Sequence, residues 1–595
     1  MSRDDVTVSR AACVVTAVVF AFGLLQLGFR LKEIQVDGAA DFSYASARQS
    51  VRRVQVGGRR GRILDRNGTA LADNRTSLTI VCRPAAFQRR TWEATATELE
   101  RAIGAVAARI GRASPLSART IRRHVDQSLA MPLTVWGDVG ERELAVFSEH
   151  EREFPGFAVE ETDVRRYPNG TLAAHLLGYV GRDRRKSEAG DERFNFVSPE
   201  MCGRAGLELY YDSFLRGVPG ERKVTVDARG FAIRDWTVTE PQAGPDLMLT
   251  LDAEIQREAE LQLRGLRGAC AVIDPRSGDV LALASSPAFD PNDFVPTLSS
   301  ELYAKLVADV SKPLLNRATG GLYAPGSTFK PITALAGLKM GVPPDAIYRC
   351  DGVYELGGLR LHCASRWGHG ALDLRSALMK SCNPFFCNLG TDVGTNALAH
   401  AARAFGLGGR TGLDFGVDAA GVVPDGDWKQ RTYGERWFPG DLAQMAIGQG
   451  MLLVSPLQMA TLAGAIGTGF LVTPHLKVGL PPDRRRLPFT EHALRTVREG
   501  MRLVVTGEGG VRGSGWRAGE GLSVSVSGKT GTAEVGRGAT RRKNTWFIAY
   551  APSENPTVAV ALVIENGESG GETAAPRVNE ILRRIFGIRD GGRET

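Results

Sequence analysis

Three strings decide the fold of this chain: Ser327-Thr-Phe-Lys330, Ser381-Cys-Asn383 and Lys529-Thr-Gly531. Each string occurs often by chance, so none of them is informative alone. In this order they supply a hydroxyl nucleophile, an amine base, a proton relay and an anchor for a carboxylate. Their joint occurrence in one chain predicts an enzyme that transfers an acyl group through a serine ester.

The first string is predicted to lie at the start of a helix. Pro325 and Gly326 would end a loop, and residues 329–338 are compatible with a helix. Residues i and i+3 of a helix share a face, so the ammonium group of Lys330 can reach the hydroxyl of Ser327. A desolvated lysine can take a proton from serine, and helix N-terminal N–H groups favour developing negative charge. We predict Ser327 as the nucleophile and Lys330 as its general base.

The second string follows a helix-like stretch at residues 371–380. Ser381, on a loop between helices, is predicted to relay a proton between Lys330 and the leaving amine. Asn383 is predicted to hydrogen-bond the amide of the substrate. The alternative is a helix N-cap made by the asparagine, with no catalytic role.

The third string is predicted to follow a strand at residues 522–527. Lys529, Thr530, Gly531 and Thr532 would then hold a free carboxylate of the substrate. The backbone N–H of Thr532 could complete an oxyanion hole with that of Ser327. The alternative is an ordinary turn that ends the strand.

A membrane anchor is predicted near the N-terminus. Residues 11–29 contain nineteen residues without a charge, which is long enough to span a bilayer. A cleaved signal peptide is the alternative, but its apolar core would be shorter. We therefore expect a short cytoplasmic tail at residues 1–10, a single transmembrane anchor at 11–30, and the rest of the chain on one side of the membrane.

The remaining chain is long enough for several domains, and its composition is that of a globular protein. Residues 31–60 are mixed and polar and predict a juxtamembrane strand or stalk, and from Gly61 to about Gln242 short apolar runs alternate with turns, which predicts an extended α+β region. Together they form one predicted domain at residues 31–245, which a linker at residues 242–245 would end. Residues 246–595 predict strands around a central helical block. The net charge of +8 indicates a solvated surface beside an anionic polymer or membrane, and no aromatic-interleaved basic motif suggests a nucleic acid. The predicted strands of this second part are 247–251, 269–274, 280–285, 522–527, 546–551 and 557–565, and its predicted helices include 253–263 and 574–586.

The chain resembles class B penicillin-binding proteins over nearly its whole length. Two segments resemble motifs of the family's N-terminal domain, called the pedestal: Gly61-Arg-Ile-Leu-Asp-Arg-Asn-Gly68 and Gly203-Arg-Ala-Gly-Leu-Glu208. Two others resemble motifs of its transpeptidase domain: Ala284-Ser-Ser-Pro-Ala-Phe-Asp-Pro-Asn292 and Ala446-Ile-Gly-Gln-Gly450. The resemblance implies an α+β chain with a pedestal (dimerisation-type) domain and a β-lactamase-like serine transpeptidase domain, whose antiparallel sheet is flanked by helices. It implies D,D-transpeptidation of peptidoglycan stem peptides on nascent glycan, outside the cytoplasmic membrane, and acylation of Ser327 by β-lactams.

The resemblance is to the elongation type of this family, penicillin-binding protein 2. Trp367-Gly-His-Gly370, Trp428 and Trp437-Phe-Pro-Gly-Asp441 carry this distinction. It implies as partners a SEDS-type glycosyltransferase and other proteins of the elongation complex. The alternatives are a division-type transpeptidase, a D,D-carboxypeptidase or β-lactamase in which water resolves the ester, and a penicillin sensor that does not turn over.

Four of the eight cysteines lie within residues 350–387. Cys350, Cys363, His369 and Cys382 have the spacing C-x12-C-x5-H-x12-C, and zinc favours thiolate and imidazole ligands of this kind. Some elongation-type relatives bind zinc at matching positions, so we expect a structural zinc that ties the loop of Cys382 from behind. Cys387 and His362 are reserve ligands. The alternatives are a Cys350–Cys363 disulfide or buried free thiols.

Overall fold

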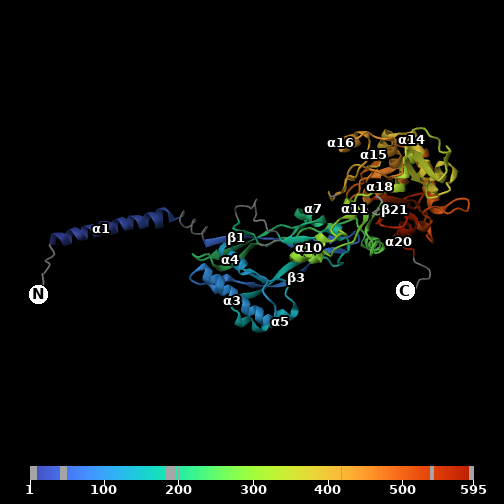
Figure 1. The fold of residues 1–595 in the computed structure, drawn as a ribbon. Coiled ribbons are helices and arrows are strands. Elements are labelled where there is room, and N and C mark those ends of the chain that lie inside the picture. The colour runs from blue at the N-terminus through green and yellow to red at the C-terminus, as the bar shows by residue number, and fades with distance from the viewer. Residues whose placement is uncertain are drawn as a thin grey trace.

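The protein is described by a computed structural model that covers residues 10–39, 50–182, 194–197, 201–416, 418–536 and 542–588. Figure 1 shows an elongated arrangement, with helix α1 at one end, a pedestal in the middle and a helix-rich C-terminal domain at the other end. The expected α+β class is confirmed, because both large parts combine helices with sheets.

Helix α1 (Arg10–Lys32) is the predicted anchor. It continues as a π-helical turn to Asp37, its mean hydropathy reaches 2.2, and none of this segment is buried. Such a helix is long and apolar enough to cross a bilayer. The expected cytoplasmic tail lies outside the described residues, apart from Arg10.

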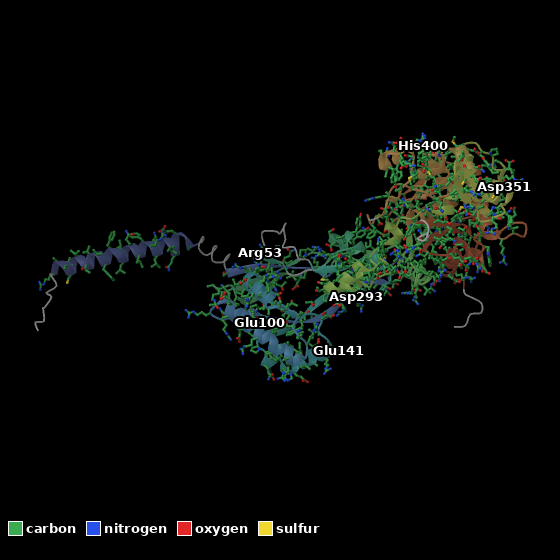
Figure 2. All side chains as sticks on the ribbon, viewed as in Figure 1. Arg53, Glu100, Glu141, Asp293, Asp351 and His400 are labelled. Atoms are coloured by element: carbon green, nitrogen blue, oxygen red, sulfur yellow. The ribbon has the colours of Figure 1, made fainter. Side chains whose placement is uncertain are left out.

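The pedestal contains two sheets. One has the strand order β10-β9-β1-β7, and the other has the order β11-β2-β3-β4, with β5 also paired to β3. Helix α3 packs its apolar face, including Leu99, Ile103 and Val106, on the second sheet, whereas Glu100 on the same helix is exposed, as is Glu141 on α5 (Figure 2). The strands are β1 (Val51–Val56), β2 (Ile63–Leu64), β3 (Ala70–Cys82), β4 (Leu133–Trp136), β5 (Phe157–Arg166), β6 (Val180–Arg182), β7 (Phe196–Val197), β8 (Met201–Gly203), β9 (Gly220–Val226), β10 (Ala232–Thr239) and β11 (Leu247–Met248), and the helices are α3 (Trp92–Ile110), α4 (Ala118–Gln127), α5 (Glu141–His150), α6 (Ala174–Leu177), α7 (Gly206–Tyr210) and α8 (Asp212–Leu215).

A buried ion cluster joins distant parts of the pedestal. The carboxylate of Glu208, which is fully buried, accepts hydrogen bonds from Arg60 at 2.6 Å and from Arg165 at 2.7 Å. The hydroxyl of Tyr167 donates to the same carboxylate at 3.3 Å. A buried carboxylate needs such partners, so the motif residue Glu208 holds the chain near Arg60 against β5.

The C-terminal domain is built on a five-stranded antiparallel sheet of order β13-β12-β22-β21-β20. Both faces are covered, and residues alternate between them: Trp546 and Ile548 face one core with helix α18 (Pro456–Thr468), while Phe547 and Ala549 face another with α9 and α20. This explains why the strands are almost continuously apolar. Their bounds are β12 (Gly268–Ile273), β13 (Val280–Ser286), β20 (Ser527–Val535), β21 (Arg542–Ala551) and β22 (Val558–Glu565), with α9 (Ala253–Gln262) and α20 (Ala575–Ile585).

A helical block and small hairpins interrupt this sheet between β13 and β20. The helices are α10 (Ser300–Ala308), α11 (Arg317–Gly320), α12 (Lys330–Lys339), α13 (Leu374–Met379), α14 (Asn383–Val393), α15 (Thr395–Ala404), α16 (Gly426–Tyr433), α17 (Pro439–Ala446), α18 (Pro456–Thr468) and α19 (Glu491–Thr506), and the short strands are β14 (Tyr348–Cys350), β15 (Val353–Leu356), β16 (Leu359–His362), β17 (Gly370–Leu372), β18 (Phe470–Val472) and β19 (Arg484–Arg486). In Figure 2 the labelled Asp351 and His400 mark this block.

Three predicted elements were wrong in their extent. The strand expected at 522–527 begins only at Ser527 and continues to Val535, because the polar third string pairs along its whole length with β21. The helix expected at 371–380 starts at Leu374, where the Asp373 side chain caps it. The strand expected at 247–251 keeps two residues, which pair with β2 of the pedestal.

The pedestal and the C-terminal domain are joined by polar contacts. Asn292 accepts from the N–H of Tyr167 at 2.9 Å and donates to its carbonyl oxygen at 2.9 Å. Tyr211 donates to the carboxylate of Asp414 at 3.2 Å, and that carboxylate also accepts from the N–H of Leu476 at 2.7 Å. These bonds fix the orientation of the two parts in this structure.

Candidate active site

All three strings meet at one cleft of about 930 Å³. Ser327, Ser381, Asn383 and the segment Thr530 to Thr532 line it, whereas Lys330 and Lys529 are fully buried beside it. The folding of the chain therefore brings together every catalytic residue that the sequence predicted.

Ser327 lies on the 3-10 turn Gly326–Phe329, directly before α12. Gly326 has φ +56°, and its N–H donates to the carbonyl oxygen of Gly448 at 2.8 Å. A Cβ on Gly448 would lie 2.0 Å from the carbonyl oxygen of Gly326, so only glycine fits there. The Ile447-Gly-Gln-Gly450 motif thus supports the turn that presents the nucleophile.

Lys330 is oriented by the second string. Its Nζ donates to the carbonyl oxygen of Ser381 and to Oδ1 of Asn383, both at 2.7 Å, and lies 3.5 Å from Oγ of Ser381. Burial lowers the pKa of Lys330 to about 8, against the opposing effect of nearby cysteine sulfurs. Lys330 and Ser327 are both described residues and lie three positions apart, but this structure contains no hydrogen bond between their side chains.

Ser381 connects the two lysines. It sits between α13 and α14 with φ +55°, and its Oγ accepts a hydrogen bond of 2.7 Å from Nζ of Lys529. Burial and the charge of Lys330 lower the pKa of Lys529 well below its usual value. A hydroxyl between two amines of lowered pKa is suited to pass a proton, as predicted for Ser381.

Asn383 is the first residue of α14, and Cys382 is its N-cap. The amide of Asn383 accepts from Lys330, and its Nδ2 donates to the carbonyl oxygen of His362 at 2.7 Å. It therefore joins Lys330 to the hairpin of His362 in this structure, a role that the sequence did not indicate.

The third string forms part of strand β20, at the edge of the sheet. The amine of Lys529 donates its hydrogen bond to Ser381 of the protein itself. The hydroxyl of Thr530 lies 3.0 Å from that of Ser514, and Oγ1 of Thr532 accepts from the N–H of Gly570 at 3.3 Å. Nε2 of Gln449 donates to the carbonyl oxygen of Thr532 at 3.4 Å. Of these three contacts of the third string, Ser514 and Gly570 were not predicted from the sequence. Gln449 lies in the motif Ala446-Ile-Gly-Gln-Gly450, which was identified from the sequence.

The four predicted metal ligands converge behind this site. Their ligand atoms all lie within 4.8 Å of one another. Nδ1 of His369 is 3.4 Å from Sγ of Cys363 and 3.7 Å from Sγ of Cys350, and Cys363 and Cys382 are 4.0 Å apart. Ligand bonds of 2.0–2.3 Å in a tetrahedron give ligand separations of about 3.3–3.8 Å. The three separations quoted are close to this range, and two or more thiolates with an imidazole are the ligands that zinc favours.

The pKa values of two of these thiols shift in opposite directions. The hydrogen bond between the two thiols lowers the pKa of Cys363 and raises the pKa of Cys382. All eight cysteines fall within the described residues, and none of them forms a disulfide bond in this structure. Cys387 donates instead to the carbonyl oxygen of Ala443 at 3.6 Å, and neither it nor His362 joins the cluster.

Comparison with known proteins agrees with this geometry. The sequence model of the penicillin binding protein transpeptidase domain matches residues 268–583, and that of the penicillin-binding protein dimerisation domain matches residues 55–249. The peptidoglycan D,D-transpeptidase MrdA of Escherichia coli K12 is 32% identical, over 98% of this chain and 95% of that protein. MrdA of Acinetobacter baumannii is 33% identical, over 94% and 85%.

Solved structures of the same family superpose on the chain. The complex between penicillin-binding protein 2 (PBP2) and MreC from Helicobacter pylori has a TM-score of 0.78 at 27% identity, over 90% of this chain and 99% of that one. The structure of Pseudomonas aeruginosa PBP2 in complex with WCK 5153 has a TM-score of 0.66 at 29% identity, over 92% and 98%.

The chain belongs to the penicillin-binding protein transpeptidases. Its full-length relatives and structural neighbours make it a class B member of the elongation type, similar to PBP2, and a serine D,D-transpeptidase.

The lowered pKa of Lys330 predicts the pH dependence of acylation. Only the neutral amine can take the proton of Ser327, so the acylation rate with a penicillin should rise with pH and level off above about pH 8. The measurement is the rate of labelling by a fluorescent penicillin from pH 6 to 10. Lys330→Arg is the control, because a guanidinium stays protonated and should leave labelling low throughout. A wild-type rate that is constant over this range would contradict the assignment.

Proposed function

We propose that this chain crosslinks peptidoglycan stem peptides by D,D-transpeptidation during cell elongation, with Ser327 as the nucleophile. The observation that carries the proposal is the convergence of three strings, in which Lys330 and Lys529 are both hydrogen-bonded to the Ser381–Asn383 loop at 2.7 Å. The names of the relatives, peptidoglycan D,D-transpeptidase MrdA, support the substrate class.

In the proposed reaction, Oγ of Ser327 bonds to the carbonyl carbon of the penultimate D-alanine and its proton passes to Lys330. The C–N bond then breaks, and D-alanine leaves with a proton relayed through Ser381. An amine of a neighbouring stem attacks the ester, the C–O bond breaks, and Ser327 regains a proton. Backbone N–H groups of Ser327 and Thr532 are proposed to stabilise the oxyanion, and Thr530 and Thr532 to hold the terminal carboxylate.

Ser327→Ala should abolish covalent labelling by a fluorescent penicillin, because it removes the bond-forming oxygen. Mass spectrometry of the labelled wild-type chain should place the acyl group on Ser327. Ser300→Ala, an exposed serine of α10, is the matched control and should label normally. Labelling of Ser327→Ala would overturn the assignment, and rapid drug hydrolysis by the wild type would favour the β-lactamase or carboxypeptidase alternative.

We also propose that Cys350, Cys363, His369 and Cys382 bind a structural zinc ion. The ligand separations support this proposal, and so does the burial of Cys350 and Cys382. Zinc would supply a tetrahedral crosslink between the hairpin segment and the N-cap of α14. No catalytic step passes through it; its effect is to fix Cys382, and with it the oxygen atoms that hold Lys330.

The purified full chain should contain about one zinc ion, measured by elemental mass spectrometry. Cys363→Ser should lose most of it and lower the thermal unfolding midpoint by several degrees, because a bound metal stabilises the native state. Cys13→Ser, in helix α1, should keep both values. Absence of zinc together with a mapped Cys350–Cys363 disulfide would contradict the proposal.

We propose that α1 crosses the cytoplasmic membrane once and that the cleft faces the outside, where stem peptides are found. Structural neighbours support partners of the elongation complex: one is PBP2 with MreC, and another, with a TM-score of 0.72 at 28% identity, is described as a peptidoglycan synthase complex that coordinates polymerization and crosslinking. We infer contacts with a SEDS-type glycosyltransferase and with an MreC-like protein.

Protease added to intact spheroplasts should remove the C-terminal domain, because it would be exposed outside the membrane. A cytoplasmic protein serves as the control and should remain intact. Affinity purification from detergent-solubilised membranes should recover the glycosyltransferase with the full chain but not with a chain that lacks α1. Protection of the C-terminal domain in spheroplasts would reverse the proposed orientation.

A further inference from the structure

The loop between α19 and β20 places a serine in the cleft that belongs to none of the three strings. Oγ of Ser514 lies 3.0 Å from Oγ1 of Thr530, and both residues line the cleft. The N–H of Ser514 donates to the carbonyl oxygen of Met379 at 3.3 Å, at the end of helix α13. The hydroxyl of Ser514 is therefore held between strand β20 and the helix that leads to Ser381.

The two neighbours of Ser514 are glycines for steric reasons. A Cβ on Gly513 would lie 2.1 Å from the carbonyl oxygen of Val504, and a Cβ on Gly515 would lie 2.5 Å from the ring of Phe547. The loop thus runs too close to α19 and β21 for side chains at either position. In the tripeptide 513–515 only Ser514 presents a side chain, and it is directed at Thr530.

The surroundings of this hydroxyl pair favour an anion. The buried Nζ of Lys529 lies 3.5 Å from Oγ1 of Thr530. Glu572 also lines the cleft, but Arg517, three residues after Ser514, pairs with it at 2.8 Å. The same loop therefore supplies a hydroxyl and the counter-ion for the nearby acid.

The hydrogen-bond capacity of the pair matches a carboxylate. Each hydroxyl has one proton to donate, and the contact between Ser514 and Thr530 uses only one of the two. A carboxylate between them would accept from both hydroxyls, and such charge-assisted bonds are stronger than the bond between two neutral hydroxyls.

Resting on the function proposed above, we propose that Ser514 and Thr530 together bind the terminal carboxylate of the donor stem peptide. Ser514 makes the site selective for a free C-terminal acid over its ester or amide. Because a β-lactam carries a carboxylate in the corresponding place, the same hydroxyl binds the drug.

The test compares a penicillin with its methyl ester as acylating agents of the full-length protein. The second-order acylation rate constant for the acid should fall roughly 10- to 100-fold in Ser514→Ala, as expected for one lost hydrogen bond to a charged group. The constant for the ester should change by less than about 3-fold. Ser514→Thr, which restores a hydroxyl, should retain most of the selectivity for the acid.

A second variant separates recognition from folding. Ser514→Asp places a negative charge beside Thr530 and should reduce acylation by the acid further than Ser514→Ala, while the ester is affected less. Ser300→Ala serves as the control and should change neither constant. Equal losses for acid and ester in Ser514→Ala, or no loss at all, would overturn the role of Ser514. Failure of the proposed function is distinguishable, because the Ser327→Ala chain would then still be labelled.

Discussion

Two buried lysine amines depend on one short loop for their hydrogen bonds, and this dependence fixes the geometry of the reactive centre. Lys330 and Lys529 are both inaccessible to solvent, and a buried cation that lacks hydrogen-bond acceptors costs several kcal/mol. One short loop supplies acceptors to both, through the carbonyl and hydroxyl oxygens of Ser381 and the amide oxygen of Asn383. Ser381 adopts φ +55° to do so, at a cost of roughly 1–2 kcal/mol. The helices and the sheet that hold this loop also hold the reactive centre.

The same loop has a second attachment. Cys382, between Ser381 and Asn383, faces Cys363 of the hairpin segment at 4.0 Å, while its neighbours bind the lysines. The position of Cys382 therefore affects the positions of Ser381 and Asn383, because the three residues are consecutive in the chain. A zinc ion bound as proposed would therefore influence the position of the lysines without taking part in the reaction.

Sequence predicted much of this architecture, because motifs and apolar runs are local signals. It predicted β12, β13, β21 and β22 and the residues at the cleft, but it placed the third string after a strand instead of inside one. Lys529-Thr-Gly531 has weak strand propensity, and only the pairing with β21 makes it extended. The sequence also suggested a contact between Lys330 and Ser327. Tertiary structure instead turned the ammonium group toward Ser381, and it brought in Ser514 from a loop with no motif.

The length of the pedestal has a consequence for where bonds are made. In Figure 1 the chain enters the pedestal at β1, and the cleft domain lies beyond its opposite end. With α1 embedded in a bilayer, the intervening pedestal sheets would separate the cleft from the lipid surface. The enzyme would then act on glycan strands at the distance from the lipid surface that the pedestal spans, although the pedestal itself performs no chemistry.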